Sequence, residues 1–574
     1  MVNLTIDGKA VSVPEGTRIL DAAKQVGVSI PTLCFLRDIN EISACRICAV
    51  EIKDSPKLVP ACSTPVQEGM EIRTASQRVM EARATNLMLI LSQHRAECTI
   101  CSRSGNCALQ TLAQDYDMRH LPFAQTPDKM DWDRHYPLIR DDSRCIKCMR
   151  CVSVCDKVQT MHVWDVLGTG ARTRVGVRDG LDLMDTNCTL CGQCITHCPV
   201  GALAARTDSK PVIRRITGKK DKVYVCQVAP AVRSAWGEDL GLSREVATVG
   251  RMVSALRALG FDYVFDTDFS ADLTIMEEGS EFLERLSHKE DYAWPMFTSC
   301  CPGWLRFIKT EFPEYVPNLS TAKSPQGMFG AVVKSYFAEK LGRDPDDIVC
   351  VSFMPCTAKK WECAVEAIND AATRDVDTVI TTREFSKMLR RYRIDVPALP
   401  EDDFDSPLGE STGAGVIFGT TGGVMEAALR SAYFLATGEN PDADAFHAVR
   451  GMDGIKAATF DIQGTKVRTA VANGLGNARK LLEEIKSGRQ AYDFVEIMAC
   501  PTGCAGGGGQ PIRDQQELGP ERGGYLRELD VEKPIRFSHE NPSVQALYKE
   551  YLEKPLSHRA HKLLHTDVSQ WSLK

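Results

Sequence analysis

Several features that would assign this 574-residue chain to a familiar class are missing from its sequence. No apolar run approaches the ~18 residues that a membrane helix requires; the longest, around Leu87 to Leu91, is far shorter. The formal net charge is −7, so no basic surface indicates binding to nucleic acid. The first residues lack the basic and apolar regions of a signal peptide. We therefore expect a cytoplasmic protein that binds neither membranes nor nucleic acid.

Nucleotide-binding motifs are also missing. The chain has no strand–G-x-G-x-x-G–helix fingerprint and no G-x-x-x-x-G-K-[ST] motif. Gly413–Gly415 and Gly422–Gly423 are rich in glycine but lack the strand context and the lysine, so we expect tight packing turns there. Direct oxidation of a nicotinamide nucleotide by this chain is disfavoured, although partner subunits could supply that step.

Cysteine, by contrast, is abundant, with 23 residues. In a large chain without an export signal, this number indicates metal or redox chemistry rather than disulfides. All but three fall into five sets: Cys34, Cys45, Cys48 and Cys62; Cys98, Cys101 and Cys107, preceded by His94; Cys145, Cys148, Cys151 and Cys155; Cys188, Cys191, Cys194 and Cys198; and Cys300, Cys301, Cys356, Cys500 and Cys504. Cys226, Cys350 and Cys363 lie on or beside apolar segments, where we expect small buried hydrophobic residues without a function.

The third and fourth sets share the spacing C-x2-C-x2-C-x3-C, the one clear internal duplication. Zinc would usually require paired C-x2-C knuckles. The spacing is instead that of bacterial ferredoxins with two [4Fe–4S] clusters, in which the fourth cysteine of each run binds the other cluster. The expected ligands are therefore Cys145, Cys148, Cys151 and Cys198 for one cluster, and Cys155, Cys188, Cys191 and Cys194 for its neighbour.

The spacing of the first two sets indicates the bound metal group less specifically. The spacing from Cys34 to Cys62 matches plant-type [2Fe–2S] ferredoxins only in part. A hairpin at 2–13 and a helix at 17–26 favour that fold, and a zinc loop is the alternative. His94 lies in a segment, 79–120, that looks helical. Three cysteines follow it, and an imidazole could supply the fourth donor of a [4Fe–4S] cluster, but the residue could equally be packed or exposed.

After residue 210 the cysteine-rich pattern gives way to alternating strand-like and helix-like segments. Strands are expected at 222–229, 263–265, 347–353, 377–380 and 494–498, with helices at 244–259, 271–286 and 383–391. Such alternation predicts an α/β domain with a largely parallel sheet. The expected fold is thus multidomain, α+β and α/β: a [2Fe–2S] ferredoxin-like domain at 1–78, a small [4Fe–4S] domain with one histidine and three cysteine ligands at 79–120, a bacterial 2[4Fe–4S] ferredoxin-like domain at 121–209, and a large α/β domain at 210–574.

The last cysteine set looks like an active site. It lies in three motifs, TSCCPGW at 298–304, MPCTAKKWE at 354–362 and EIMACPTGCAGGGGQP at 496–511. Two of these follow expected strands, where ligands bind in open α/β sheets. Four cysteines would suffice for a cluster, so one thiol is free for chemistry. The glycines at 506–509 would let the backbone approach a bulky cofactor closely. A buried structural cluster is the alternative interpretation.

These motifs resemble the signatures TSCCPxW, MPCxxKxxE and ExMxCxxGCxxGGGQP of the [FeFe]-hydrogenases, and every fixed position is met. The order, spacing and length of the whole chain resemble the large clostridial members with four accessory clusters. The resemblance implies an enzyme that reversibly reduces protons to dihydrogen with electrons from ferredoxin. Its H-cluster is a [4Fe–4S] cubane joined to a di-iron unit that carries carbon monoxide, cyanide and an azadithiolate bridge, and hydrogenase maturation proteins would be further partners.

The same resemblance assigns roles to individual residues. Cys301, Cys356, Cys500 and Cys504 would hold the cubane, with Cys504 bridging to the di-iron unit, and Cys300 would pass protons to the bridging amine. Lys359 would donate a hydrogen bond to a cyanide. The remaining cofactor-lining positions would be Pro230, Ala231, Gln326, Met354, Phe418 and Met498. Some family members carry serine where this chain has Ala231, so we expect one cyanide hydrogen bond fewer.

A proton route is implied as well, from Cys300 through Glu278, Ser320 and Glu281 towards Arg285 near the surface. The spacing of the three helical residues places them along one helix face, although without the family a solvated acidic face would be preferred. The resemblance also favours His94 as a ligand.

Three other functions compete with this one. The N-terminal half also resembles the electron-input module of respiratory complex I, which would lack the motifs after residue 290. A hydrogen sensor usually departs at the proton-relay residues, and a non-catalytic iron–sulfur assembly protein loses parts of the three motifs. Both the motifs and the relay residues are intact here.

Overall fold

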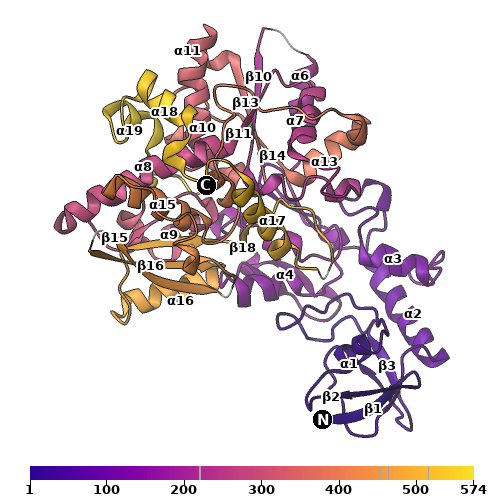
Figure 1. Ribbon diagram of the computed structural model, residues 1–574. Coiled ribbons are helices and arrows are strands. Elements are labelled where there is room, and N and C mark those ends of the chain that lie inside the picture. Colours follow the sequence, from indigo (N-terminus) through magenta and orange to yellow (C-terminus); the bar gives the residue numbers. More distant parts are fainter. Residues whose placement is uncertain (219–220, 453, 463, 515) are drawn as a thin grey trace.

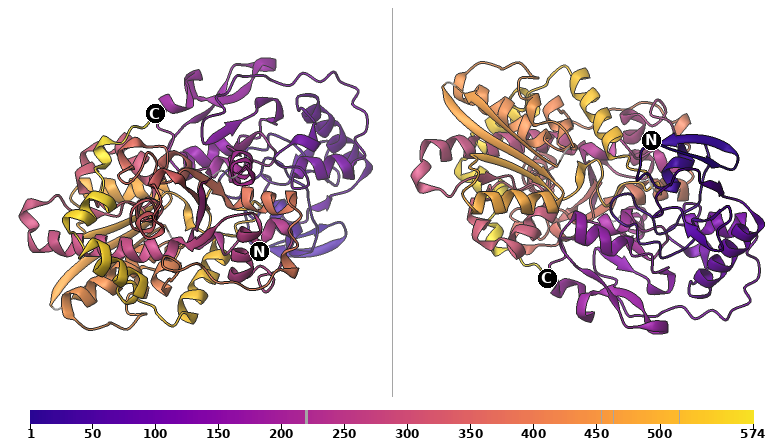
Figure 2. Two further views of the ribbon diagram at one scale, coloured as in Figure 1. Left: turned by 90° about the horizontal axis from the view of Figure 1, so that it is seen from above. Right: turned by 90° about the horizontal axis from the view of Figure 1, so that it is seen from below.

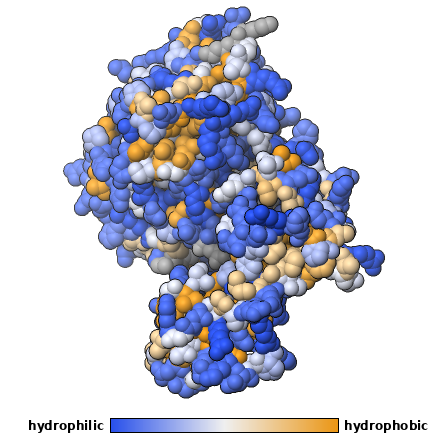
Figure 3. Space-filling model, turned by 90° about the vertical axis from the view of Figure 1, so that its right-hand side faces the viewer, coloured by the Kyte–Doolittle hydropathy of each residue, from blue (hydrophilic) through white to orange (hydrophobic). Residues whose placement is uncertain are grey.

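The computed structural model describes residues 1–574 except 219–220, 453, 463 and 515. The chain runs from an N-terminal lobe, through a cysteine-rich middle region, to a large C-terminal body (Figure 1). Seen from the side, the N-terminal lobe stands off the body as a narrow extension (Figure 3).

The N-terminal lobe is a mixed five-stranded sheet with the order β2-β1-β5-β3-β4. Its strands are β1 (Val2–Ile6), β2 (Lys9–Val13), β3 (Ala49–Ile52), β4 (Leu58–Pro60) and β5 (Glu71–Arg73). β1 and β2 form the predicted hairpin, because Asp7 and Gly8 both adopt the positive φ that a two-residue hairpin turn requires. The predicted helix is α1 (Ile19–Gln25), which buries Ile19, Ala22 and Ala23.

The middle region begins with α2 (Gln77–Ser92), which ends before His94, so this histidine lies in a loop and not on the helix that the sequence indicated. α3 (Ala108–Asp115) follows the loop. The duplicated segment contains the short helices α4 (Arg150–Ser153) and α5 (Gln193–Thr196). β6 (Leu138–Arg140) pairs antiparallel with β9 (Leu203–Ala205), and β7 (Trp164–Leu167) with β8 (Arg174–Val177). The first pairing closes the segment, so its two cysteine runs face each other.

The C-terminal body contains two four-stranded sheets. The first has the order β11-β10-β13-β14, all parallel: β10 (Val223–Val228), β11 (Tyr263–Asp266), β13 (Ile348–Met354) and β14 (Thr378–Thr381). The second has the order β12-β17-β16-β15: β12 (Met296–Phe297), β15 (Ile455–Ile462), β16 (Thr465–Asn473) and β17 (Phe494–Met498). The predicted α/β body with its parallel strands is confirmed. The antiparallel β15–β16 pair was not predicted, since charged and polar residues interrupt both strands.

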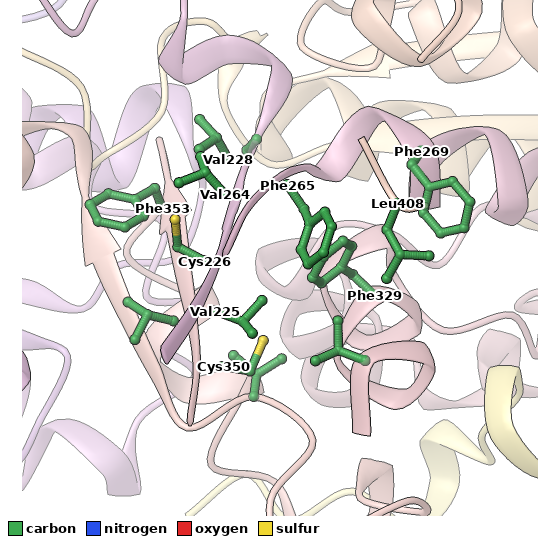
Figure 4. Packing of buried hydrophobic residues seen from close by; sticks show 14 of the residues in the cluster. Val225, Cys226, Val228, Val264, Phe265, Phe269, Phe329, Cys350, Phe353 and Leu408 are labelled. Carbon is green, nitrogen blue, oxygen red and sulfur yellow. The ribbon is translucent and has the colours of Figure 1, made fainter. Parts of the chain in front are cut away.

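The main core packs against the first sheet. Phe265 of β11 meets Phe329, with ring centroids 5.8 Å apart (Figure 4). Cys226 and Cys350 lie on neighbouring strands of this sheet and are fully buried, and Cys363 is buried beside them in the same core. All three cysteines outside the sets therefore occupy apolar surroundings, as expected.

Helices cover both sheets (Figure 1). α7 (Val249–Ala258) begins later than predicted, because the Thr248 side chain caps it by accepting a hydrogen bond from the Arg251 amide. α8 (Thr267–Ser287) directly follows β11, and α13 (Thr382–Arg391) directly follows β14. The other main helices are α6 (Ser209–Thr217), α9 (Pro302–Glu311), α10 (Pro325–Val332), α15 (Gly423–Thr437), α16 (Leu475–Lys486), α17 (Gly519–Glu532), α18 (Pro542–Leu547) and α19 (His558–Leu564).

The glycine-rich segment around residue 414 differs from the prediction. Gly413 and Gly415 do not form a turn but belong to the short helix α14 (Gly413–Ile417). A Cβ on Gly415 would lie 2.7 Å from the Asp268 carbonyl oxygen, so this helix requires glycine to pack directly on α8. Gly422, with φ +76°, does start a helix from a turn-like position as the N-cap of α15.

The C-terminus folds back onto the cysteine-rich middle region, beside which it lies in both views of Figure 2. Lys574 pairs with Asp185 at 2.6 Å, and the Arg306 guanidinium donates to the Leu573 carbonyl at 2.7 Å. None of the described helices has both the length and the apolar character needed to cross a membrane.

Candidate active site

A buried cavity of about 80 Å³ lies where the carboxyl ends of strands from both sheets meet. Parallel strands point their carboxyl ends to one edge, the usual ligand site of α/β sheets. The predicted residues of the cofactor pocket all line it: Pro230, Ala231, Cys300, Cys301, Gln326, Met354, Cys356, Lys359, Phe418, Met498, Cys500 and Cys504. The structure thus brings together residues that are up to 274 positions apart, from Pro230 to Cys504.

Each of the four proposed cubane ligands is fixed by a regular element. Cys356 follows β13 and Cys500 follows β17. Cys301 is the N-cap of α9, with Pro302 at the first helical position, and Cys504 ends the short strand β18 (Pro501–Cys504). The thiols are therefore held by the backbone rather than by a mobile loop, as a rigid metal centre requires.

The chemistry of these donors fits an iron–sulfur cluster. Burial raises the pKa of the Cys356 thiol to about 12 and raises that of Cys500 well above its usual range. Buried thiols of this kind ionise only when a metal replaces their protons. Within the described part of the chain, no three His, Cys, Asp or Glu side chains are arranged to hold a single metal ion.

Lys359 is the cation of the cavity. Its ammonium is buried and donates to both Glu362 carboxyl oxygens, at 2.7 and 2.9 Å, and to the Cys300 carbonyl at 3.2 Å. Burial alone would lower its pKa, but Glu362 outweighs burial and the net shift is upward. Gln326 donates to the same carboxylate at 2.9 Å. Lys359 therefore stays charged and oriented by Glu362, a residue inside the MPCxxKxxE motif that the sequence analysis left without a role.

Cys300 and Glu278 form the inner part of the expected proton route. Cys300 lines the cavity, and burial followed by the charge of Glu278 raises its pKa well above the usual value. Glu278 is fully buried, and neither of its carboxyl oxygens has a hydrogen-bond partner among the described residues. Burial, reinforced by Glu281, raises its pKa to about 8, while Ser320 and the Ser299 backbone oppose the shift. Glu278 is thus a neutral acid near neutral pH.

The outer part of the route is a closed hydrogen-bond network. The Ser320 hydroxyl donates to Glu281 at 2.8 Å, and the Arg285 guanidinium donates to the other oxygen of that carboxylate at 2.5 Å. These side chains are buried, so a solvated acidic face does not form here. Arg285 is only 3% exposed and therefore does not lie at the surface as expected. Its guanidinium carbon lies 5.3 Å from the centroid of the exposed Tyr292 ring.

The duplicated cysteine runs cross over in the way that the bacterial ferredoxin pattern predicts. Burial raises the pKa of Cys148, and the thiols that add most to this are Cys198 and Cys151. Burial likewise raises the pKa of Cys155, where the contributing thiols are Cys188 and Cys191. The fourth cysteine of each run thus lies beside the first three of the other.

His94 is oriented for ligation. Its Nδ1 lies 3.0 Å from the Arg144 carbonyl oxygen, the geometry of a donated hydrogen bond. This bond holds the proton on Nδ1 and leaves the Nε2 lone pair free, the arrangement found in metal-binding histidines. Burial lowers the pKa of His94, which keeps the imidazole neutral. His94 lines one cavity together with Cys98, Cys101 and Cys107.

The cysteine sets follow one another in space. Asn40 donates to the Cys34 carbonyl at 2.6 Å and to the Cys148 carbonyl at 2.9 Å, joining the N-terminal lobe to the duplicated region. Gln159 donates to the Cys191 sulfur at 3.4 Å and to the Ala499 carbonyl at 2.8 Å, joining that region to the active-site loop. No local sequence pattern predicted either contact, because Cys148 lies far in sequence from Asn40, and Ala499 from Gln159.

The four glycines at 506–509 serve a different purpose from the one expected. Only Gly507 lines the cavity. A Cβ on Gly508 would lie 2.5 Å from the Cys191 carbonyl oxygen and 2.7 Å from the Gly192 Cα, and one on Gly509 would lie 2.8 Å from the Pro355 carbonyl carbon. The run therefore lets backbone pack against backbone, between the duplicated region and the active-site loops, more than it admits a cofactor.

Glu496 is a second acid that the sequence analysis did not assign. It lies in β17, is fully buried, and accepts hydrogen bonds from the Gly422 and Met425 amides at 2.8 and 2.7 Å. Burial raises its pKa to about 7, although the two amides oppose this. Its place in the ExMxC motif is explained by this contact, which ties the N-terminus of α15 to the active-site strand.

An α/β body with five cysteines in one buried cavity, approached by four further cysteine sets, defines an iron–sulfur oxidoreductase. Family models match most of the chain. They are the iron-only hydrogenase large subunit, C-terminal domain (222–508), the iron hydrogenase small subunit (520–569), a 2Fe-2S iron–sulfur cluster binding domain (1–77), the NADH-ubiquinone oxidoreductase-G iron–sulfur binding region (83–122) and a 4Fe-4S dicluster domain (144–202).

Curated relatives extend over the full length. The NADP-reducing hydrogenase subunit HndD of Solidesulfovibrio fructosivorans is 48% identical over 99% of this chain and 98% of its own length. Iron hydrogenase 1 of Clostridium pasteurianum is 38% identical over 98% of this chain and 99% of its own. Among solved structures, that of apo [FeFe]-hydrogenase HydA1 from Chlamydomonas reinhardtii, a variant, is 45% identical and covers 62% of this chain and 98% of that one, with a TM-score of 0.56.

The chain belongs to the [FeFe]-hydrogenases, as the three motifs indicated. It is an oxidoreductase of hydrogen metabolism with an iron–sulfur electron relay. Iron–sulfur assembly factors are also similar, for example that of Danio rerio at 34% identity, but over only 62% of the chain. The sensor and assembly alternatives are therefore not favoured.

The packing of the glycine run can be tested by adding one methyl group. We expect Gly508→Ala to lower the free energy of unfolding by ~1–3 kcal/mol, the usual effect of overpacking, because its Cβ has no space beside Cys191. The measurement is the thermal unfolding midpoint of the cluster-loaded protein. Gly524→Ala is the matched control, since no atom lies within 4 Å of that Cβ in the exposed face of α17. Equal midpoints for the two variants would contradict the packing role.

Proposed function

We propose that this hydrogenase catalyses the reversible reduction of protons to dihydrogen and exchanges electrons with ferredoxin. The observation that supports this most is the cavity itself, where four rigidly held thiols, a fifth thiol and a buried ammonium converge. The proposed cofactors are one [2Fe–2S] cluster, three accessory [4Fe–4S] clusters and the H-cluster. When bound, the H-cluster supplies the site at which two protons and two electrons combine to dihydrogen.

The proposed ligands of the H-cluster cubane are Cys301, Cys356, Cys500 and Cys504. Around it, Lys359 would point its ammonium at an anionic ligand while Glu362 holds it in place. Met354, Met498, Phe418, Pro230 and Ala231 would exclude water from the rest of the cavity, since all of them are buried. A dry cavity strengthens the electrostatic effect of the single ammonium.

Electrons would enter through the accessory clusters. Cys34, Cys45, Cys48 and Cys62 would hold the [2Fe–2S] cluster, and His94, Cys98, Cys101 and Cys107 the first [4Fe–4S] cluster. Both would deliver to the cluster of Cys145, Cys148, Cys151 and Cys198, the first through the Asn40 contact. The cluster of Cys155, Cys188, Cys191 and Cys194 would then pass electrons to the cavity, since Gln159 joins Cys191 to the residue before Cys500.

Protons would travel through this chain's own side chains. Cys300 would exchange a proton with Glu278, which carries one near neutral pH because of its burial. Ser320 would connect Glu278 to Glu281, whose carboxylate accepts from the Ser320 hydroxyl. Arg285 would pair with Glu281 at the outer end of the route. Along this proton route, groups that carry a proton therefore alternate with groups that can accept one.

The electron partner has a second candidate. The relative with 48% identity is named as a subunit of an NADP-reducing hydrogenase. A nucleotide-binding partner subunit could therefore replace ferredoxin, although this chain carries no dinucleotide fingerprint of its own. Maturation proteins would supply the di-iron unit. The cytoplasmic location expected from the sequence stays a prediction.

The proposed function is tested by maturation followed by a donor comparison. Protein produced with the hydrogenase maturases should show infrared bands of bound carbon monoxide and cyanide, and should produce dihydrogen with reduced ferredoxin as the only donor. NADPH alone should give no dihydrogen, because the sequence carries no dinucleotide fingerprint. The absence of the infrared bands would contradict the H-cluster, and dihydrogen from NADPH alone would contradict the proposed partner.

The role of Cys300 is tested by removing its thiol. Cys300→Ala should keep the infrared bands but lower dihydrogen production by ~100-fold or more, the usual loss when a positioned proton donor is removed. Cys363→Ala is the matched control, since that thiol is buried in the same domain outside the cavity. Production near the wild-type rate in both variants would exclude the relay through Cys300.

The raised pKa of Glu278 predicts that the stability of the folded protein depends on pH. Its folded pKa of about 8 lies above the ~4.3 of an unfolded chain, so the folded state binds more protons between these values. The contribution of Glu278 to stability therefore falls as pH rises through that window. Glu278→Gln should flatten this fall in the thermal midpoint between pH 5 and 9, and should lower dihydrogen production by ~100-fold.

Glu284→Gln serves as the control for this experiment, because Glu284 lies on the same helix but is exposed. It should leave both the pH dependence and the activity near wild type. A Glu278→Gln variant that kept the wild-type fall in stability would show that Glu278 does not titrate in this window.

A further inference from the structure

Arg103 is a buried cation without a protein partner. It lies in the loop between Cys101 and Cys107 and is 6% exposed. None of its three guanidinium nitrogens makes a hydrogen bond to any residue that the structure describes. It lines the same cavity as His94, Cys98, Cys101 and Cys107. An uncompensated buried charge costs several kcal/mol, so such a residue requires an anion that binds beside it.

The charged residues around Arg103 strengthen this need for a bound anion. Arg144 lines the same cavity but already has a carboxylate partner, Asp141, at 2.9 Å. On another side lies Arg383, whose pKa falls to about 10 through burial, with the charge of Arg103 adding to the fall. Among the described residues, Arg103 thus faces another cation and forms no ion pair of its own. The carboxylates that line a second cavity with Arg103 are paired with other cations: Glu238 with Arg522, Asp239 with Arg513 and Glu384 with Lys360. The counter-charge of Arg103 must therefore come from a group bound beside it.

Arg103 also lies within electrostatic reach of two cysteine sets. Arg103 lines one cavity with Cys107 and with Gly201, which lies three residues after Cys198. Cys107 belongs to the His94 set, whereas Cys198 belongs to the duplicated region. The two sets touch here, because a Cβ on Gly201 would collide with the Cys101 sulfur. One guanidinium therefore stands at the junction between two neighbouring sets.

We propose that Arg103 is the shared counter-charge of two relay clusters, the one held by His94, Cys98, Cys101 and Cys107 and the one held by Cys145, Cys148, Cys151 and Cys198. The inference rests on the cluster ligands given under the proposed function. Each cluster becomes more negative by one charge when it accepts an electron, so a fixed cation stabilises the reduced form more than the oxidised form. Arg103 thereby raises both reduction potentials and favours electron transfer across the junction.

Redox titration of the full-length, cluster-loaded protein, followed by electron paramagnetic resonance, tests this proposal. In Arg103→Gln, both clusters should become harder to reduce, with at least a tenfold lower ratio of reduced to oxidised cluster at a given potential, or ~59 mV. Coupling to the imidazole nitrogen identifies the cluster of His94. Arg103→Lys keeps the charge and should shift both potentials less. The [2Fe–2S] cluster should not move and serves as an internal reference.

Arg119→Gln is the matched control, because it removes one positive charge beside the same cavity. Arg119 is 79% exposed along its side chain and pairs with Asp117 at 2.5 Å, so solvent already screens it. Its substitution should leave every potential unchanged.

The possible outcomes decide the proposal. Unchanged potentials in Arg103→Gln would overturn it, as would equal loss of the His94 cluster from the Gln and Lys variants, which indicates a structural role. Loss of that cluster from the Gln variant alone would support a requirement for charge. If the wild-type protein itself lacked a histidine-ligated cluster, the proposed ligand assignment would fail, a result distinct from any behaviour of the variants.

Discussion

The burial of thiols in one cavity between two sheets is the constraint on which the rest of the structure depends. A thiol that burial keeps protonated can be ionised there only by a metal, so the protein must hold each sulfur in position before the cofactor arrives. Strand ends and a helix N-terminus do this for Cys356, Cys500 and Cys301. Because these elements belong to both sheets, the whole α/β body has to form before the site exists.

A second requirement is close contact between regions that bind separate clusters. Electron transfer needs short distances, and side chains between two backbones would lengthen them. The glycines at 201 and 508 remove those side chains where the cysteine sets meet. Asn40 and Gln159 add hydrogen bonds across the same junctions. Glycines and amides therefore allow close contact at these junctions, and Arg103 adds a charge at the one beside Gly201.

The proton route and the electron route each contain both paired and unpaired buried ionisable groups. On the proton route, Glu281 is paired with Arg285 and Ser320, whereas Glu278 has no hydrogen-bond partner among the described residues and holds its proton through burial, reinforced by the charge of Glu281. On the electron route, Arg103 makes no hydrogen bond to a carboxylate in the described part of the chain, while Arg144 does. In each case the unpaired group is the one that faces the reacting charge, since a partner within the protein would cancel its effect.

The sequence by itself determined the family, the cluster types and the residues that reach the cavity, because cysteine spacing and three local motifs carry that information within a few residues. It also predicted the four strands of the first sheet, the strand β17 before Cys500, and the helices α7, α8 and α13. Only the tertiary structure decided which groups are buried: it made Glu278 a neutral acid, buried Arg285 and left Arg103 without a hydrogen-bond partner among the described residues. The physical reason is that burial and pairing depend on segments hundreds of residues apart, which no local pattern records.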